Sequence, residues 1–519
     1  MRRAALHRVA TGRSAVNNPR GSFTFNGTIT GYAPADFMLG TPISFTTPAP
    51  EIHGLVREFR NGFFVQDKWQ VSRKLTLNYG LRYELPMVPI TVNGVATELN
   101  ANQTQLIGGT PGFQLLAPQH TDWAPRLGFA YRITEKTVFS GGGGIYYNPN
   151  QTNSFTFLNT NPPYTTILNC SYTVGSSEPI PTLSNPVVPG SGVCPSAPTA
   201  GTIVTNPWPA PTPRMNQWSA DLQRQLWDGG GLDLGYLGSH GYHLDRNFWN
   251  NTPLYPGPGS INSRRPNPLF GVIRTIATDV IMNYEALTIK FNQRLKHGVT
   301  ATAFYTWSHT LDVSENSNSS GNPLNPYWWK GDYGNGGDDR RHRFVATFVY
   351  NIPFFPQASP FLKTALGGWQ ANGIVTLQSG GPINVSTSTD TANTASGGSY
   401  RPNLVHTPTA NCGRGHLIGC LDASAYTVSN LYPAAQNYAY GNEGRNILFG
   451  PGSQTVNFSM FKNFPIHERL RLQFRFESFA FLNRANFGNP GSTFGTTTFG
   501  NITSASGSRT IQFGAKLLF

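Results

Sequence analysis

Apolar and polar residues alternate one by one along several stretches of this chain. Between Leu75 and Glu84 every odd position is Leu or Tyr, whereas the even positions are Thr, Asn, Gly, Arg and Glu. Residues 470–477 repeat the pattern, with Leu and Phe alternating with Arg, Gln and Glu. Since side chains alternate between the two faces of a β-strand, each stretch predicts a strand with one apolar and one polar face. Further strands are predicted at residues 63–69, 126–133, 218–223, 287–292, 299–307, 343–352, 369–377 and 511–519.

The connections between these strands alternate between short and long. Short ones are predicted at residues 71–74, 134–136, 228–231, 296–298 and 465–468. Long ones are predicted at residues 85–123, 148–214, 240–282, 312–340, 380–452 and 482–507. Outer-membrane barrels have short periplasmic turns and long external loops. The sequence therefore predicts an all-β fold, an antiparallel up-and-down transmembrane β-barrel with long loops at one end and about 13 or 14 strands in this chain.

The predicted register assigns each side chain to lipid or to the barrel lumen. At a rise of ~3.3 Å per residue and a tilt near 45°, a strand of about ten residues spans roughly 23 Å, close to the apolar band of such barrels. Lipid-facing positions are predicted at Leu75, Leu77, Leu81, Leu472 and Phe474, with Leu472 near the bilayer middle, and lumen-facing positions at Asn78, Arg82, Arg471 and Arg475. Aromatic residues near strand ends predict an interfacial girdle, or alternatively cross-strand packing in a soluble sheet; they are Trp69, Tyr83, Tyr131, Trp218, Trp307, Tyr350 and Trp369.

The chain ends on the apolar face of its last predicted strand. The order polar, Gly, apolar, aromatic at Gln512, Gly514, Leu517 and Phe519 resembles the terminal strand that the bacterial outer-membrane assembly machinery recognises. We therefore expect the protein in the outer membrane of a Gram-negative bacterium, with membrane lipid and that machinery as partners.

Composition agrees with this class. Charged residues are 12% of the chain, compared with about 25% in soluble domains. The net charge is +13, but Lys and Arg are scattered singly along alternating strands, so we expect no nucleic-acid partner. An apolar run of about 18 residues, which a transmembrane helix needs, does not occur. The N-terminus is basic without a following apolar segment, so the chain lacks its own signal peptide, and we expect an N-terminally truncated piece.

The four cysteines fall in predicted external loops. Because exported chains meet an oxidising compartment, we favour disulfides, with the local pairs Cys170–Cys194 and Cys412–Cys420 preferred among three connectivities. Metal ligation is the alternative, but no Cys-x-x-Cys motif occurs and no His lies at zinc spacing. Since no nucleophile elbow or His-Glu-x-x-His motif is present either, we expect no enzyme activity, catalytic site, cofactor site or metal site.

Two loop segments are candidates for ligand contact. Tyr327, Trp328 and Trp329 are suited to stacking on sugar rings or peptide side chains, although ordinary loop packing explains them equally well. Arg340 and Arg341 follow two aspartates in the densest charge cluster of the chain. The cluster suits an anionic ligand, but a network of salt bridges at the mouth of the strands is the favoured interpretation.

Several segments resemble a known family. Residues 62–71 and 75–84 resemble the barrel of TonB-dependent outer-membrane receptors, and residues 35–40, 338–344, 368–370 and 486–490 resemble the Oar-like branch. This resemblance implies a barrel of about 22 strands with an export signal, a plug and a TonB-contacting segment before it. The chain would then be the C-terminal barrel portion, with an irregular segment at residues 1–56 that has possible short strands and the barrel portion at residues 57–519.

The resemblance also implies a function. The intact protein would import a bulky nutrient such as an oligosaccharide, peptide or siderophore, and would contact the TonB complex only through the missing N-terminal part. The alternative is an outer-membrane surface adhesin or scaffold barrel without active transport. Because the first strands of the family barrel would be absent, we expect an open or imperfectly closed sheet, with the strand at residues 63–69 at one edge and Phe519 at the other.

Overall fold

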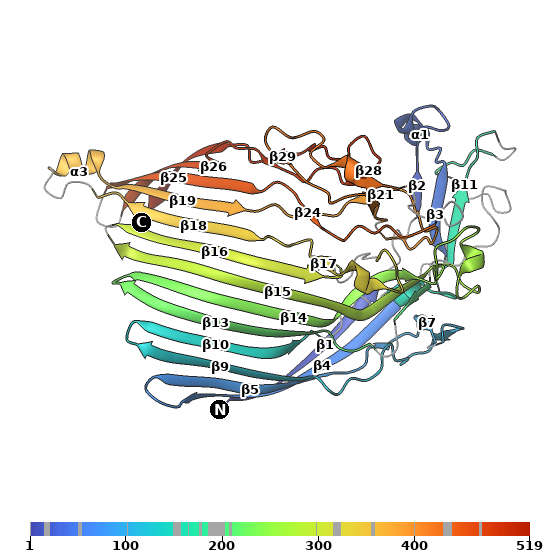
Figure 1. The fold of residues 1–519 in the computed structure, drawn as a ribbon, viewed down its shortest axis with the longest axis horizontal. Helices are drawn as coiled ribbons and strands as arrows, with labels where there is room; N and C mark the ends of the chain where they lie inside the picture. The colour runs from blue at the N-terminus through green and yellow to red at the C-terminus, as the bar shows by residue number, and fades with distance from the viewer. Residues whose placement is uncertain are drawn as a thin grey trace.

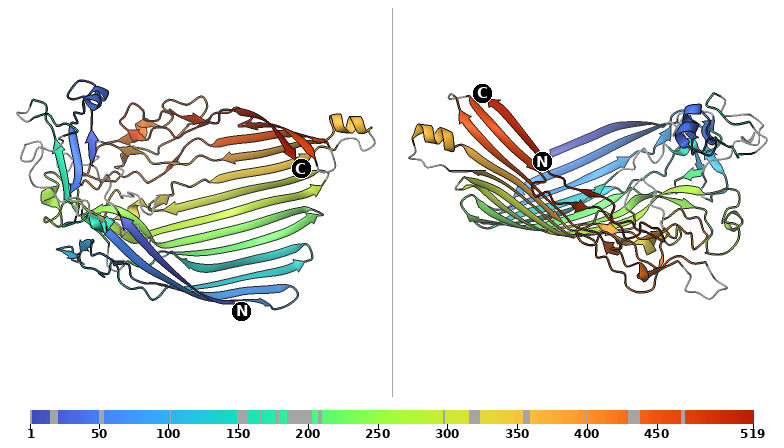
Figure 2. Two further views of the ribbon diagram at one scale, coloured as in Figure 1. Left: turned by 180° about the vertical axis from the view of Figure 1, so that it is seen from behind. Right: turned by 90° about the horizontal axis from the view of Figure 1, so that it is seen from above.

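One large, curved antiparallel sheet dominates the computed structural model (Figures 1 and 2). The structure describes residues 2–14, 21–49, 54–100, 102–148, 157–164, 166–175, 179–184, 203–206, 210–296, 298–314, 323–353, 359–398, 400–428, 438–466 and 470–519. The sheet has 17 strands. The long ones are β1 (Arg2–Ser14), β4 (Gly54–Gln70), β5 (Leu75–Pro86), β9 (Trp123–Thr134), β10 (Thr137–Tyr147), β13 (Arg214–Trp227), β14 (Gly230–Asn250), β15 (Ile273–Lys296), β16 (Val299–Asp312), β18 (His342–Asn351), β19 (Trp369–Gln378), β25 (Ser453–Pro465), β26 (Arg471–Phe479) and β30 (Thr510–Leu518). Three short strands complete it, namely β6 (Ile90–Thr91), β12 (Ile203–Thr205) and β17 (Gly334–Asn335).

From β4 onward each long strand pairs with the next one along the chain, as the alternation predicts. We call the end with the short connections the turn end and the other the loop end. The C-terminus lies at the turn end (Figure 1). The antiparallel, nearly all-β fold predicted from the sequence is therefore confirmed.

The register confirms which side chains share a face. Leu472 lies opposite Leu517, and Phe476 lies opposite Phe513, so the apolar positions of β26 and β30 form one surface. The same holds across the sheet, where Leu77 lies opposite Phe129. All seven aromatic residues proposed for the girdle have the parity of this apolar face.

One positional detail is wrong. Leu472 is the second residue of β26, next to the turn that joins it to β25, so it lies at the turn end of the strand rather than at its middle. Alternation determines the face of a residue, but its depth depends on where the strand begins.

The predicted edge of the sheet is also wrong. Arg2–Ser14 forms β1, which pairs with β4 along its whole length from Arg2 opposite Gln66 to Ser14 opposite Gly54. The segment before residue 57 therefore contributes a long strand. The sequence hides it because apolar and polar residues do not alternate there; pairing with β4 satisfies its backbone groups instead. Among the described residues no register joins β1 to β30, so this part of the sheet is open there.

Two connections between strands also differ from the pattern predicted from the sequence. Predicted loop 240–282 is partly strand, because β14 and β15 continue as a paired ribbon in which Leu244 lies opposite Val280 and Asn250 lies opposite Ile273. The connection between β18 and β19 is long although it lies at the turn end, and it contains helix α3 (Pro360–Leu366) (Figure 1).

The long connections fold into structure of their own at the loop end (Figure 1). A small sheet joins β2 (Ser22–Thr24), β3 (Ser44–Ala49) and β11 (Thr166–Ser171), with helix α1 (Ala33–Leu39) between the first two. Two-stranded pairs are formed by β7 (Thr97–Leu99) with β8 (Leu106–Gly108), β20 (Pro382–Ile383) with β24 (Leu448–Phe449), β21 (Ser386–Thr387) with β28 (Thr493–Phe494), β22 (Asn403–Leu404) with β23 (Tyr426–Thr427), and β27 (Asn486–Phe487) with β29 (Ala505–Ser506). Short 3-10 helices are η1 (Phe157–Thr160), η2 (Asn262–Arg264), η3 (Trp329–Asp332) and η4 (Ala423–Ala425).

Buried apolar side chains gather at the loop end, in these connections and in the strand segments beside them. One cluster surrounds Leu115, Leu158 and Ile276. A second surrounds Ile383, Leu421 and Tyr426. Within the described ranges, no helix is long and apolar enough to cross a membrane.

Candidate functional site

A hollow of about 1320 Å³ lies on the polar face of the sheet. It extends over β4, β5, β9, β10, β13 and β14 and reaches Tyr284 on β15. On most strands the outermost lining residues, such as Phe64, Ser140 and Tyr146, have polar-face parity, which assigns the hollow to that face. Its polar side chains include Gln66, Lys68, Asn78, Arg82, Arg126, Ser140, Gln217, Ser219, Asp221 and Ser239.

Glycines form part of the floor of the hollow. A Cβ atom on Gly142 would lie 2.7 Å from the carbonyl oxygen of Leu127, and one on Gly80 would lie 2.8 Å from that of Val65. Both distances are too short for real Cβ contacts, so larger residues cannot occupy these positions without a shift of the backbone. The glycine run at residues 141–144 therefore allows close strand approach inside β10.

The charges around the hollow are partly paired. Arg82 bonds to Glu84 through both Nε and Nη2. The Arg126 guanidinium carbon lies 4.3 Å from the centre of the Tyr146 ring, within cation–π range. Cationic, acidic, amide and aromatic groups thus line one open surface, which suits a hydrated polar solute better than an apolar one.

The loop end is held by buried ion pairs that the sequence analysis did not identify. Arg401 Nη1 lies 2.6 Å from Asp332 Oδ1, and Arg445 Nη2 lies 2.7 Å from Asp312 Oδ1. Arg445 also donates to the carbonyl oxygen of Asp312. These contacts tie the connection after β19 to the end of β16 and to η3. In the sequence these four residues are isolated charges within long polar loops. Such charges do not indicate which partner, distant along the chain, each one contacts.

Two buried acids in the loops have strongly shifted pKa values. Burial raises the pKa of Glu443 to about 8, although a hydrogen bond from Tyr426 and the charge of Arg401 oppose the shift. Burial likewise raises the pKa of Glu98 to about 8. Both carboxyls are therefore largely protonated at neutral pH, which lowers the cost of enclosing them in the loops.

The aromatic ligand candidates differ in exposure. Tyr327 donates a 2.7 Å hydrogen bond from its hydroxyl to the carbonyl oxygen of Thr252. Trp329 begins η3 and lies within cation–π range of Arg246 and Lys330. Trp328 is 67% exposed, so its ring is the most available of the three for stacking on a ligand.

The two arginine candidates make contacts within their own loop. Arg340 Nη1 donates to the carbonyl oxygens of Asp339 and Gly337 at 2.7 and 3.2 Å. Arg341 Nη2 lies 3.3 Å from Asp339 Oδ2, and the fully buried Asp339 accepts from the backbone N–H of Thr310 at 2.9 Å. The cluster thus contains the salt bridge Arg341–Asp339, whereas Arg340 bonds to backbone carbonyl oxygens, and a ligand contact by either arginine remains a proposal.

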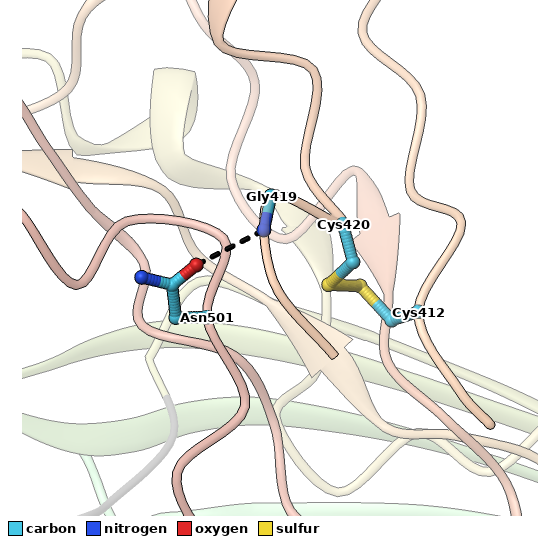
Figure 3. Close-up of a disulfide and its surroundings, with 4 residues drawn as sticks. All are labelled: Cys412, Gly419, Cys420 and Asn501. Carbon is cyan, nitrogen blue, oxygen red and sulfur yellow. Dashed lines mark hydrogen bonds between the residues drawn. A yellow bond between two sulfur atoms is a disulfide. The ribbon is translucent and has the colours of Figure 1, made fainter. Parts of the chain in front are cut away.

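Cys412 and Cys420 are joined by a disulfide, the pairing preferred from the sequence (Figure 3). The backbone N–H of Gly419 donates to Asn501 Oδ1 at 3.0 Å, which ties this small loop to the segment before β30. Cys170 is also disulfide-bonded. Its predicted partner Cys194 lies outside the described residues.

The proposed assembly signal is divided between the two faces. Gln512 and Gly514 lie opposite Glu477 and Arg475 on the polar face, whereas Leu517 lies opposite Leu472 on the apolar face. Phe519 follows the strand and is 97% exposed.

A sequence family described as "Outer membrane beta barrel domain" matches residues 4–512. No curated protein matches the chain.

Solved structures with a similar chain trace include three outer-membrane proteins. The transporter YddB from Escherichia coli has a TM-score of 0.46 and 7% identity, with 92% of this chain and 52% of that chain covered. The ferripyoverdine receptor from Pseudomonas aeruginosa has a TM-score of 0.43 and 10% identity, with 91% and 40% covered. BauA, the ferric preacinetobactin receptor from Acinetobacter baumannii, has a TM-score of 0.43 and 11% identity, with 91% and 44% covered. The chain thus spans about half the length of these proteins or less.

Proposed function

Since this chain belongs to the family of outer-membrane β-barrel domains, matched over residues 4–512, we propose that it forms the barrel portion of a TonB-dependent receptor. Its place is the outer membrane of a Gram-negative bacterium. The intact receptor would bind a bulky nutrient at the loop end and pass it along the polar face of the sheet. The segments at residues 35–40, 338–344, 368–370 and 486–490 support assignment to the Oar-like branch.

The hollow on the polar face is the observation that carries this proposal. Its volume of about 1320 Å³ exceeds the usual range of pockets for drug-sized ligands, and it is open rather than enclosed. Hydroxyl, amide and charged groups line it along β5, β9 and β13, as a passage for a hydrated solute requires. An oligosaccharide, a peptide or a siderophore fits this polar lining.

The proposed assignment to TonB-dependent receptors also implies two protein partners. The terminal strand with Gln512, Gly514, Leu517 and Phe519 would be recognised by the outer-membrane assembly machinery. The energy for import would come from the TonB complex through a segment outside this chain. Both partners are proposals that the family assignment supports.

A surface adhesin or scaffold is the second candidate, and the folded loop end favours it. Two buried clusters and the ion pairs Arg401–Asp332 and Arg445–Asp312 make the loops a structured platform. Such a platform with an exposed Trp328 can hold a partner without any passage through the sheet.

Uptake measurements in cells that produce the chain in its full-length receptor separate the two candidates. We would measure accumulation of labelled oligosaccharide, peptide and siderophore with and without an uncoupler of the proton gradient. A receptor shows uptake that the uncoupler abolishes, whereas an adhesin shows surface binding alone.

A matched pair of variants tests the polar face directly. Ser219→Trp places a large side chain in the hollow, whereas Ala220→Trp places the same side chain on the opposite, apolar face. We expect Ser219→Trp to lower uptake while surface binding persists and Ala220→Trp to change neither. Equal uptake by both variants would count against passage along this face.

A further inference from the structure

A second hollow, of about 600 Å³, lies on the opposite face of the sheet. Its floor is a single cross-strand row in which Tyr305 lies opposite Phe344, Phe344 opposite Leu377, and Leu377 opposite Gln454. This row has the parity of the apolar face, which includes the exposed Trp307. The hollow is therefore on the surface that faces lipid, at the loop end of β16, β18, β19 and β25.

The disulfide loop forms one wall of this hollow. Cys412, Gly413 and Arg414 line it, together with residues 484–487 from the segment before β30. The backbone of the loop is fixed, because Cys420 N donates to Gly500 O at 2.9 Å and Ile502 N donates to Leu417 O at 2.8 Å. The wall is thus built by covalent and backbone contacts and does not depend on a ligand to hold it.

The charge of the hollow has one sign. Its lining contains Arg414, Arg484 and His342 but no Asp or Glu. Within the described part of the chain, the Arg414 side chain forms no ion pair and is exposed. Arg484 Nη1 donates to Gln454 Oε1 at 2.6 Å, and His342 Nδ1 lies 2.8 Å from the Tyr305 hydroxyl. Guanidinium groups therefore remain available above an aromatic and aliphatic floor.

The loop also carries apolar side chains outward. Ile418 is 83% exposed and Leu417 is 38% exposed, directly after Arg414 and His416. Cationic groups beside exposed aliphatic groups are typical of segments that lie at a membrane interface. A loop on the lipid-facing side of the sheet is placed for that contact.

We propose that this hollow binds a lipid of the outer leaflet through a phosphorylated headgroup. The loop end of such barrels faces the cell exterior, so the hollow lies at the level of the outer-leaflet headgroups. Guanidinium groups bind phosphate oxygens by charge-assisted hydrogen bonds, and the phosphate would lie between Arg414 and Arg484. An acyl chain would lie on Tyr305, Phe344 and Leu377. This site is separate from the polar face, and it does not depend on transport.

Native mass spectrometry of the detergent-solubilised chain tests the proposal. Delipidated protein would be titrated with diphosphorylated lipid A, with the same lipid after removal of its phosphates, and with inorganic phosphate alone. We expect saturable binding of lipid A only. Binding of the dephosphorylated lipid with equal affinity, or of inorganic phosphate as tightly as lipid A, would overturn the assignment.

Two matched variants complete the test. Combined Arg414→Gln and Arg484→Gln should weaken lipid A binding by about 10- to 30-fold, as removal of two interfacial cations predicts. Combined Arg73→Gln and Lys74→Gln removes two exposed cations at the turn end and should leave binding unchanged. Far-UV circular dichroism would confirm equal strand content in both proteins. Unchanged affinity in the first variant, or an equal loss in the second, would refute a site at the disulfide loop.

Discussion

Substitution of Leu222 by Arg tests the assignment of faces and depth together. Leu222 lies on β13 opposite Phe139 and Leu234, and it is 37% exposed on the apolar face. It precedes the end of the strand at Trp227 by five positions. At about 2.3 Å of depth per residue in a tilted strand, Leu222 lies roughly 12 Å from the turn end, near the middle of an apolar band about 25 Å tall. Arg at the midplane costs about 2 to 4 kcal/mol.

Two controls isolate the causes of this cost. Gln223→Arg introduces the same charge at the next residue of β13, on the polar face, and we expect almost no change in stability. Leu472→Arg introduces it on the apolar face but at the turn end of β26, where the cost falls to about 0–1 kcal/mol.

The assay is a reversible guanidinium titration of folding into lipid vesicles, followed by tryptophan fluorescence. The free energy of unfolding comes from the midpoint and the slope, and an unchanged slope indicates that the same surface is exposed in each variant. Equal losses for Leu222→Arg and Gln223→Arg would refute the faces assigned to β13. Equal losses for Leu222→Arg and Leu472→Arg would refute the depth.

Three further predictions concern the loop end. Cys412→Ser with Cys420→Ser should increase hydrogen exchange around the small loop while strand content by circular dichroism stays constant; a global loss of strands would contradict this. Because the pKa of Glu443 is raised from 4.5 to about 8, the native state binds more protons in that range, so loop stability should fall as pH rises from 4.5 to 8. Glu443→Gln should make loop stability, measured by hydrogen exchange, nearly independent of pH in this range. An unchanged pH dependence would refute Glu443 as its cause. Arg445→Met breaks a buried ion pair and should destabilise the loop by about 3 to 5 kcal/mol in limited proteolysis; Arg132→Met, at an exposed pair, should cost less than about 1 kcal/mol.

The sequence by itself predicts most of the long strands and their faces. In β5 and β26 the alternation is local, because successive side chains of any strand point to opposite faces whatever lies beside it. The end at which each connection lies follows from the same pattern, and so does the apolar parity of the final strand. The pairing of Cys412 with Cys420 was also accessible, since the two lie close together in one long connection.

Much of the candidate site was not predictable in this way. The lumen-facing side chains Asn78 and Arg82 were predicted, but the floor of the hollow also includes Gly80 and Gly142, each packed closely against the backbone of a neighbouring strand. The partners of Arg401 and Arg445 lie in other connections, and no local pattern indicates which of many loop carboxylates each arginine reaches. Arg340 and Arg341 are ligand candidates by sequence, and only the fold shows that both bond to their own loop.

Tertiary structure decided the features that depend on distant segments meeting. β1 has no clear alternation, and its place in the sheet comes from backbone pairing with β4, which does not require an alternating pattern of side chains. The hollow on the apolar face exists because residues 412–414 and 484–487 meet over a row from four strands. Strand periodicity is set by backbone geometry within a few residues, whereas these contacts require closure of long loops whose paths are determined by packing against each other.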